Sequence, residues 1–168
     1  MLFLLDANVL IDANRDYYSF DVVPEFWSWL IHMGNQDRVK IPLEAYEEIK
    51  DGNDNLALWA KEMSAEEALL FPEETNIELV QTVIQEGYAP DLSDIEIEKI
   101  GRDPFLIAYA LNDIRNRCLV TTEKSAPGKK RANRRIPDVC NDLSITSCHT
   151  FIFVKKLGFK TKWEISTT

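Results

Sequence analysis

Several residue types on which enzymes often depend are scarce in this sequence of 168 residues. The two histidines, His32 and His149, lie far apart and follow no nucleophile motif, so no Ser–His–Asp or Cys–His arrangement is indicated. The three cysteines, Cys118, Cys140 and Cys148, are odd in number and lack the spacing of zinc ligands. We expect them to be reduced thiols in or near the core. No Gly-rich phosphate-binding loop is present.

Long hydrophobic runs are also missing. No apolar run reaches the roughly 18 residues that a membrane span needs. The apolar start, Met1 to Leu5, is too short for a signal peptide and has no basic flank. We therefore expect a buried first strand in a cytoplasmic protein with no membrane partner. No repeat, low-complexity stretch or linker divides the chain, so a single domain is expected.

Basic residues are outnumbered, because 19 Lys and Arg stand against 28 Asp and Glu, and the net charge is −9. This balance argues against a general nucleic-acid binder, which usually has a basic face. However, six of the basic residues lie between Lys124 and Arg135, where there is no acid, so 13 basic residues remain for the rest of the chain. Such a loop either holds a phosphate backbone locally or is only a solvated loop, and the sequence leaves both open.

Strands alternate with helices along the chain. We expect strands at residues 2–5, 38–41, 118–122 and 143–145, and an edge strand near Trp163. Helices are expected between them, including one that Ser93 and Glu96 begin with a capping box. This alternation predicts an α/β fold, a three-layer α/β/α sandwich with a mainly parallel central sheet.

Acidic residues stand where a parallel sheet exposes its ligand sites. Asp6 follows the first strand and Glu123 follows the third, and ligands of open α/β sheets bind beyond the carboxyl ends of the strands. Asp103 opens a helix, and Glu48 lies one turn after Glu44 on the helix that follows the second strand. Gathered carboxylates repel one another unless a cation such as Mg²⁺ or Mn²⁺ offsets their charge, and such ions activate water for attack at phosphorus.

Each acid also has an ordinary structural interpretation, which the sequence leaves open. Asp6 suits the start of a turn, and Asp103, which precedes a proline, suits a helix cap. Glu44 and Glu48 suit the solvated face of a surface helix. The argument for a site therefore depends on the order and context of the whole set.

In order and context, these segments resemble the motifs of the PIN-domain ribonuclease family. Leu4 to Asn8 is similar to its first motif, a hydrophobic strand followed by Asp, a small residue and Asn or Ser. Ile41 to Ile49 resembles the second, in which a Glu precedes an aliphatic residue; Glu48 fits this place best and Glu44 is the alternative. Asp103 to Ala110 resembles the third, and Leu119 to Glu123 the fourth. The resemblance implies a PIN-like domain over residues 1–168, with a helical insertion at about residues 51–98.

The resemblance also implies a function, that of a metal-dependent endoribonuclease with Mg²⁺ or Mn²⁺ as cofactor and RNA as substrate. Many members of the family are toxins held by an antitoxin protein, and homodimers are common. The catalytic, metal-binding residues would be Asp6, Glu48, Asp103 and Glu123. The residues that orient them would be Asn8, Thr121, Asp138 and Glu44. The contacts with RNA would come from Lys129, Lys130, Arg131, Arg134 and Arg135.

Two features depart from the family pattern. The fourth motif usually ends in Asp, and here Glu123 stands there; the aromatic residue that usually follows is replaced by the basic loop. The glutamate at position 123 keeps an alternative open, a degenerate PIN-like domain that binds RNA or a protein partner without cutting. The chain resembles a bacterial and archaeal subgroup in which a stretch like Ile136 to Cys140 is typical. Asp138 within it is either an additional acid of the site or a helix cap.

Overall fold

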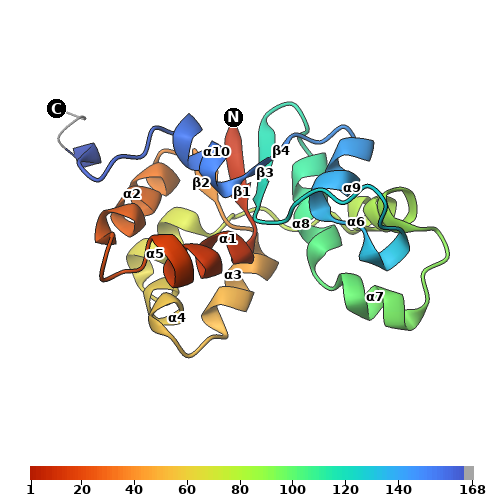
Figure 1. Ribbon diagram of the computed structural model, residues 1–168, viewed down its shortest axis with the longest axis horizontal. Helices are drawn as coiled ribbons and strands as arrows, with labels where there is room; N and C mark the ends of the chain where they lie inside the picture. The colour runs from red at the N-terminus through yellow and green to blue at the C-terminus, as the bar shows by residue number, and fades with distance from the viewer. Residues whose placement is uncertain (165–168) are drawn as a thin grey trace.

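The computed structural model describes residues 1–164. A central sheet has the strand order β2-β1-β3-β4, and each neighbouring pair of strands is parallel (Figure 1). The strands are β1 Leu2–Leu5, β2 Val39–Lys40, β3 Arg117–Thr121 and β4 Ser147–His149. The two central strands, β1 and β3, are packed on both faces, which is why their sequences are almost continuously apolar.

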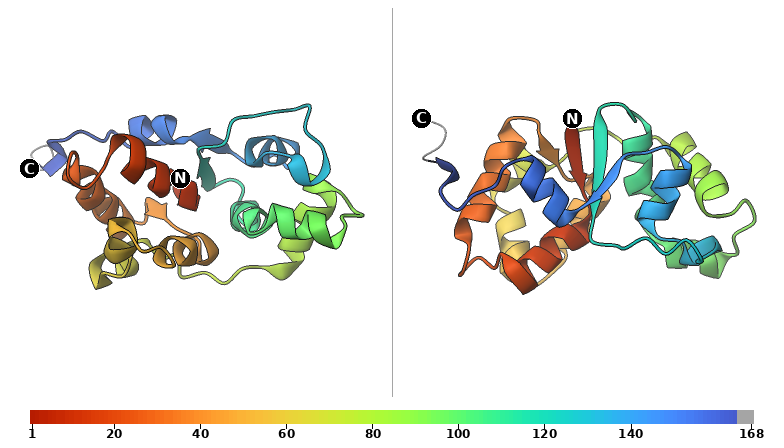
Figure 2. Two further views of the ribbon diagram at one scale, coloured as in Figure 1. Left: turned by 60° about the horizontal axis from the view of Figure 1, so that its bottom comes forward. Right: turned by 45° about the horizontal axis from the view of Figure 1, so that its top comes forward.

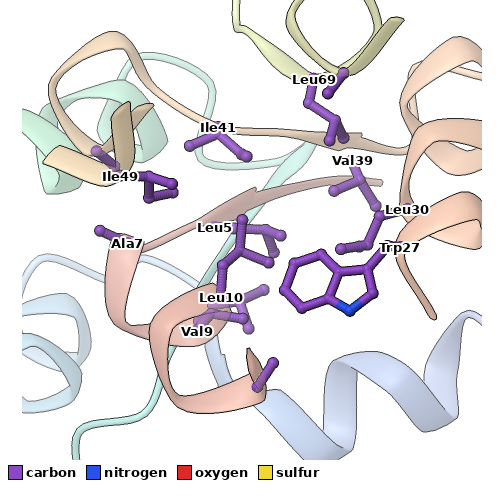
Figure 3. Packing of buried hydrophobic residues seen from close by; sticks show 14 of the residues in the cluster. Leu5, Ala7, Val9, Leu10, Trp27, Leu30, Val39, Ile41, Ile49 and Leu69 are labelled. Atoms are coloured by element: carbon purple, nitrogen blue, oxygen red, sulfur yellow. The ribbon is translucent and has the colours of Figure 1, made fainter. Parts of the chain in front are cut away.

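One face of the sheet is covered by helices from the first half of the chain and by the last helix (Figures 1 and 2). These are α1 Ala7–Asp12 with its π-helical extension η1 Ala13–Tyr17, α2 Pro24–Asn35, α3 Leu43–Lys50, α4 Asn55–Ala60, α5 Met63–Leu69 and α10 Thr150–Lys156. Figure 3 shows how Leu5 of β1 meets Leu10 of α1 and Trp27 and Leu30 of α2 in this core.

The opposite face is covered by helices from the second half of the chain. These are α6 Ile77–Thr82 with its π-helical extension η2 Val83–Tyr88, α7 Asp94–Ile100, α8 Asp103–Leu111, the 3₁₀ turn η3 Arg131–Asn133 and α9 Ile136–Asp142. Leu4 and Leu119 point into this second core, whereas their neighbours Leu5 and Val120 point into the first. The predicted three-layer α/β/α sandwich is therefore confirmed, and its sheet is parallel throughout residues 1–164.

The order of the strands creates a switch point at the centre of the sheet. The chain leaves β1 toward β2 on one side and returns to β3 on the other side of β1. In parallel sheets ligands bind at the carboxyl ends of strands that diverge in this way. Asp6 directly follows β1 and Thr121 ends β3, so both stand at this point. In Figure 1 this edge of the sheet faces downward, between α3 and α7.

Two expected strands were placed wrongly. Residues 143–145 form the turn after α9 instead of a strand, because Ser144 has a positive φ of 59° and the Ile145 N–H donates to the Cys140 carbonyl at 2.8 Å. The fourth strand begins at Ser147. No strand occurs near Trp163 within residues 1–164; its indole N–H donates to the Glu25 carbonyl at 3.1 Å.

Two other expectations hold, the helix start at Ser93 and the placement of the cysteines in or near the core. The capping box of Ser93 and Glu96 begins α7 as predicted. The three cysteines form no disulfide in the described part of the chain; Cys118 and Cys140 are buried and Cys148 is half-buried. No helix within residues 1–164 has the length and apolar character needed to cross a membrane.

Candidate functional site

Asp6 is fixed at the switch point by both central strands. Its backbone N–H donates to the Val120 carbonyl at 3.0 Å, which continues the β1–β3 ladder by one residue. Its carboxylate accepts a hydrogen bond from the Thr121 hydroxyl at 3.0 Å. The residue is only 7% exposed, and although it stands at the N-cap of α1, its side chain makes no capping hydrogen bond. The carboxylate is therefore held in place by the Thr121 hydroxyl.

Asp103 reaches the same edge of the sheet through the turn between α7 and α8. Gly101 ends α7 with φ of 52° and ψ of −122°, a backbone conformation that strongly favours glycine. The turn makes Arg102 the N-cap of α8 and places Asp103 in its first turn, where it makes no capping hydrogen bond. The structural alternative that Asp103 is a helix cap is thus wrong, and its carboxylate faces a cavity instead.

A cavity of about 210 Å³ opens at this edge, and we call it the acidic cavity. The charged residues that line it are the acids Asp6, Glu44, Glu48 and Asp103 and the bases Lys99 and Arg102. Their formal charges sum to −2. Within residues 1–164 none of the four acids forms an ion pair, although two cationic side chains line the same cavity.

Burial and mutual repulsion oppose ionisation of the two deepest acids. Burial raises the pKa of Asp6 to about 6, and the charges of Glu48 and Glu123 add to the increase. The hydrogen bond from the Thr121 hydroxyl and the backbone N–H of Asn8 both lower this pKa. Burial raises the pKa of Asp103 to about 7, followed by repulsion from Asp6, Glu123 and Glu48, while Arg135 lowers it. These shifts show that the predicted acids lie close enough to interact.

Glu44 and Glu48 occupy the acidic cavity in different ways. Glu48 is exposed, and its carboxylate acts on Asp6 and Asp103 through its charge. Glu44 is anchored, because its Oε1 accepts a hydrogen bond of 2.6 Å from the Thr75 hydroxyl and its carbonyl accepts one of 2.6 Å from Arg102. Its Oε2 is buried without a hydrogen-bond partner within residues 1–164.

Glu123 lies next to Asp103 but is engaged by the protein. Its Oε1 accepts from Arg135 at 2.9 Å and its Oε2 accepts from the Ile136 N–H at 2.7 Å. The Glu123 N–H donates to the Thr121 hydroxyl at 3.2 Å, which links the turn after β3 to the residue that holds Asp6. Glu123 thus joins the start of α9 to the end of β3, and both of its oxygens are occupied.

A second cavity, of about 260 Å³, adjoins the first, and we call it the basic cavity. The two share Lys99, Ile100 and Asp103 in their linings. The charged residues that line the basic cavity are the acids Asp103 and Glu123 and the bases Lys99, Lys129, Arg134 and Arg135. Their formal charges sum to +2, the reverse of the acidic cavity.

The five basic residues proposed for RNA contact are placed very differently. Lys129, Arg134 and Arg135 line the basic cavity. Arg134 also pairs with Asp142 at 2.5 Å. Lys130 is exposed and lines neither cavity.

Arg131, the fifth, is held by acids of the α7 region. It donates to Glu96 through Nε at 2.7 Å and through a terminal nitrogen at 2.8 Å, and to Asp91 at 2.7 Å. It adopts a positive φ of 53°. Arg131 therefore fastens the basic loop to the region of α7.

Of the other residues expected to orient the acids, two lie at the site and one lies outside it. Asn8 lines the acidic cavity and Thr121 contacts Asp6. Asp138 neither caps α9 nor lines either cavity; its oxygens accept from the Ser125 hydroxyl at 2.5 Å and the Ala126 N–H at 2.8 Å. Asp138 thus holds the start of the basic loop.

Sequence reasoning missed two cations that line the acidic cavity and one buried hydroxyl near Asp103 and Glu123. Lys99 and Arg102 come from the end of α7 and the turn after it, a segment whose acidic character concealed them. The buried Tyr88 hydroxyl has no hydrogen-bond partner within residues 1–164, and burial and the charges of Asp103 and Glu123 raise its pKa. The Gly101-Arg102-Asp103 turn was the available signal, since a glycine before a charged helix start marks a sharp change of direction.

The donor set suits Mg²⁺ or Mn²⁺, which prefer carboxylate oxygens and water. In the described chain no three His, Cys, Asp or Glu side chains lie close enough together to hold a metal ion. Mg²⁺, however, is often bound through one or two carboxylates with water completing its coordination. The excess negative charge of the acidic cavity and the unpartnered Oε2 of Glu44 are both consistent with such a cation.

Comparison with known proteins gives one match. A family model described as "Domain of unknown function (DUF4411)" matches residues 3–161. No curated protein and no solved structure matches the chain.

Proposed function

Since the chain belongs to the family described as "Domain of unknown function (DUF4411)", a description that names no activity, we propose from the site that it is a metal-dependent endoribonuclease. One observation carries the proposal. Carboxylates from the end of β1, from α3 and from α8 converge on one cavity at the switch point of a parallel sheet, and no ion pair within residues 1–164 neutralises them. The resemblance of these segments to the PIN-domain motifs supports the same function, with RNA as the substrate class and the cytoplasm as the location.

Asp6 and Asp103 would hold the cation with water completing its coordination, and Glu48 and Glu44 would add negative charge to the same cavity. A bound Mg²⁺ or Mn²⁺ supplies charge stabilisation at phosphorus and a nucleophilic water at neutral pH. The chain's own residues then have defined tasks. Thr121 fixes the rotamer of Asp6 through its hydrogen bond, and the hydrogen bonds that Glu44 accepts from Thr75 and Arg102 hold its part of the cavity lining in place.

A second candidate function is favoured by Glu123. Both of its carboxylate oxygens are occupied, by Arg135 and by the Ile136 N–H, so it is not free to serve as a fourth acid in this arrangement. A domain that binds RNA or a protein partner without cutting it would not need a fourth free carboxylate. Uptake of Mn²⁺ separates the two candidates, because a binding domain needs no cation at Asp6 and Asp103.

The test is cleavage of labelled RNAs in Mn²⁺ or Mg²⁺, with an EDTA control and the variants Asp6→Asn and Asp103→Asn. Glu47→Gln is the matched control, because Glu47 is an exposed acid of α3 that lines neither cavity. We expect cleavage that depends on metal, is lost in both Asp variants by at least about a hundredfold and persists in Glu47→Gln. Cleavage that survives Asp6→Asn or Asp103→Asn would reject the site assignment. Absence of cleavage together with absence of metal uptake would favour the binding-only function.

A further inference from the structure

We propose that the basic cavity is a phosphate subsite, in which Lys99 and Lys129 bind the RNA phosphate next to the one at the acidic cavity. The inference rests on the proposed function and deepens it, because it assigns the residues that hold the strand and the class of strand that fits. It is carried by the reversal of charge between two adjoining cavities, by the availability of two ammonium groups and by the anchoring of the cavity wall.

The reversal of charge occurs over a short stretch of the surface. Lys99, Ile100 and Asp103 belong to both cavities, so the linings are continuous. The formal charge is −2 in the acidic cavity and +2 in the basic cavity. A cation is favoured in the first and an anion in the second. A phosphodiester chain presents anions at regular intervals, so one phosphate placed near a cation in the acidic cavity leaves its neighbour close to the basic cavity.

Two of the basic side chains are available for an anion. Arg134 and Arg135 are already paired with Asp142 and Glu123. Lys99 forms no ion pair within residues 1–164; its Nζ donates to the neutral Asn133 side chain at 2.6 Å, which orients it. Lys129 has neither an ion pair nor a side-chain hydrogen bond in the described part of the chain. An ammonium group without an acidic partner breaks no ion pair when it binds a phosphate.

The wall that carries these lysines is anchored in place. Arg131 ties the basic loop to the region of α7 through Glu96 and Asp91, and the hydrogen bond between Lys99 and Asn133 adds a second link between the same segments. These contacts connect residues 34 to 40 positions apart in the sequence. They explain why a residue such as Arg131 keeps a positive φ, which is costly in isolation. The subsite is therefore largely preformed in the free protein.

The size of the cavity and the overall charge indicate a single strand. A volume of about 260 Å³ is below the range of about 300–1,000 Å³ typical of pockets that enclose a whole small molecule. It suits a phosphate group with part of its sugar. A duplex binder would need a broad basic face, whereas this chain has a net charge of −9 and a local basic region. A narrow positive groove that follows the backbone is typical of single-strand binding.

The test is the affinity of the full chain for a fluorescein-labelled single-stranded oligouridine RNA, measured by anisotropy in EDTA at several KCl concentrations. The double variant Lys99→Ala/Lys129→Ala is compared with Lys124→Ala/Lys155→Ala, which removes the same charge from exposed positions outside both cavities. We expect the first pair to weaken binding about tenfold and to lower the slope of log affinity against log salt by about 0.7, the value for one phosphate of a single strand. We expect the second pair to change the affinity less than about twofold, the size expected of remote charges.

Each outcome decides between the claims. Equal losses of affinity in the two double variants would show only general electrostatic attraction and would overturn the subsite. An unaltered affinity in Lys99→Ala/Lys129→Ala, or no RNA binding by the wild type, would also overturn it. Lys129→Ala alone guards against misfolding, since it removes no hydrogen bond or ion pair of the side chain within residues 1–164, and it should weaken binding about threefold. The expected losses in a protein that never cleaves RNA would support the subsite while rejecting the ribonuclease. Normal RNA cleavage by the wild type, together with an unchanged salt slope in Lys99→Ala/Lys129→Ala, would support the ribonuclease and reject the subsite.

Discussion

The Thr121 hydroxyl donates a hydrogen bond of 3.0 Å to the Asp6 carboxylate across the two central strands. Both residues stand at the carboxyl ends of their strands, and both are nearly inaccessible to solvent, at 1% and 7% exposure. The same hydroxyl accepts the N–H of Glu123 at 3.2 Å. Thr121 therefore connects two of the acids predicted from sequence, and it acts on the site by positioning Asp6.

Loss of this hydroxyl should weaken metal binding without changing the fold. Thr121→Val keeps the shape of the side chain but removes a hydrogen bond that lowers the pKa of Asp6, so that pKa should rise above about 6. We expect the affinity for Mn²⁺ at pH 6.5 to fall by about tenfold, the size typical of residues that orient metal ligands. Thr121→Ser restores the hydroxyl and should restore most of the affinity. Titration calorimetry checks this, and equal affinities in wild type and Thr121→Val would contradict it.

Asp103 should make the metal-free protein less stable as the pH rises. Its folded pKa of about 7 lies above the unfolded value of about 3.9, so between these values the folded state binds more protons than the unfolded state. The free energy of unfolding therefore falls as the pH increases through this window. Asp103→Asn removes the ionisation and should be more stable than wild type by about 2 kcal/mol at pH 8, and nearly equal to it at pH 4.

Urea denaturation in EDTA at the two pH values measures this difference. Glu47→Gln, which alters an exposed acid outside the cavities, should show no such dependence on pH. A loss of stability in Asp103→Asn at both pH values would mean that the carboxylate has a structural partner in the folded protein.

Binding of a divalent cation should reverse the loss of stability that ionisation of Asp103 causes at high pH. Binding of Mn²⁺ or Mg²⁺ between ionised carboxylates stabilises the folded state by about 2.7 kcal/mol at a hundredfold excess over the dissociation constant. The gain should be larger at pH 8 than at pH 5.5, because protons compete for Asp6 and Asp103 at the lower pH. Thermal unfolding with and without Mn²⁺ measures it. The increase should vanish in Asp6→Asn; an increase of equal size there would place the cation elsewhere.

The fold and the acids were predictable because their signals are local. The apolar strands, the capping box at Ser93 and the acids after β1 and β3 depend on a few neighbouring residues each. In a parallel sheet the carboxyl ends of the strands share one edge, so the meeting of Asp6 with the turn after β3 follows from the fold class alone.

The remaining features depend on contacts that no local pattern records. Arg131 was expected to bind RNA, but its partners Asp91 and Glu96 lie 40 and 35 positions away in the chain. Lys99 enters the site only because α7 is folded against the basic loop. The fourth strand was misplaced because Leu143 and Ser144 form the turn that ends α9, and a serine gives no clear sign of the positive φ that this turn requires.

Glu123 should prove to be a structural residue. Glu123→Ala removes the acceptor of the Ile136 N–H and one half of an ion pair, so we expect a loss of about 2 kcal/mol in the free energy of unfolding in EDTA. Arg135→Ala removes only an exposed partner and should cost less than about 1 kcal/mol. Urea denaturation of both variants gives the comparison. If Glu123→Ala cost nothing, its carboxylate would be free for a cation and the argument for a binding-only domain would weaken.

The close approach of α2 to α5 gives a prediction about the core that is independent of the site. A Cβ at Gly34 would lie 2.5 Å from the Ala68 carbonyl oxygen, which belongs to backbone and cannot swing away. Lys40 donates to the carbonyls of both Gly34 and Ala68, at 3.0 and 2.8 Å, so separating the helices would also disturb a buried ammonium group. We expect Gly34→Ala to lower the free energy of unfolding by about 3 kcal/mol, the upper end of the cost of overpacking.

Gly128 supplies the matched substitution in the basic loop. A Cβ there would meet nothing within 4 Å, and its φ lies outside the region that favours glycine. Gly128→Ala should therefore leave stability unchanged or raise it by about 0.5 kcal/mol, because alanine has fewer conformations in the unfolded chain. Urea denaturation of both variants measures the contrast. A small effect of Gly34→Ala would show that α5 can move without disturbing Lys40, and the tight contact between the two helices would then add little to the stability of the fold.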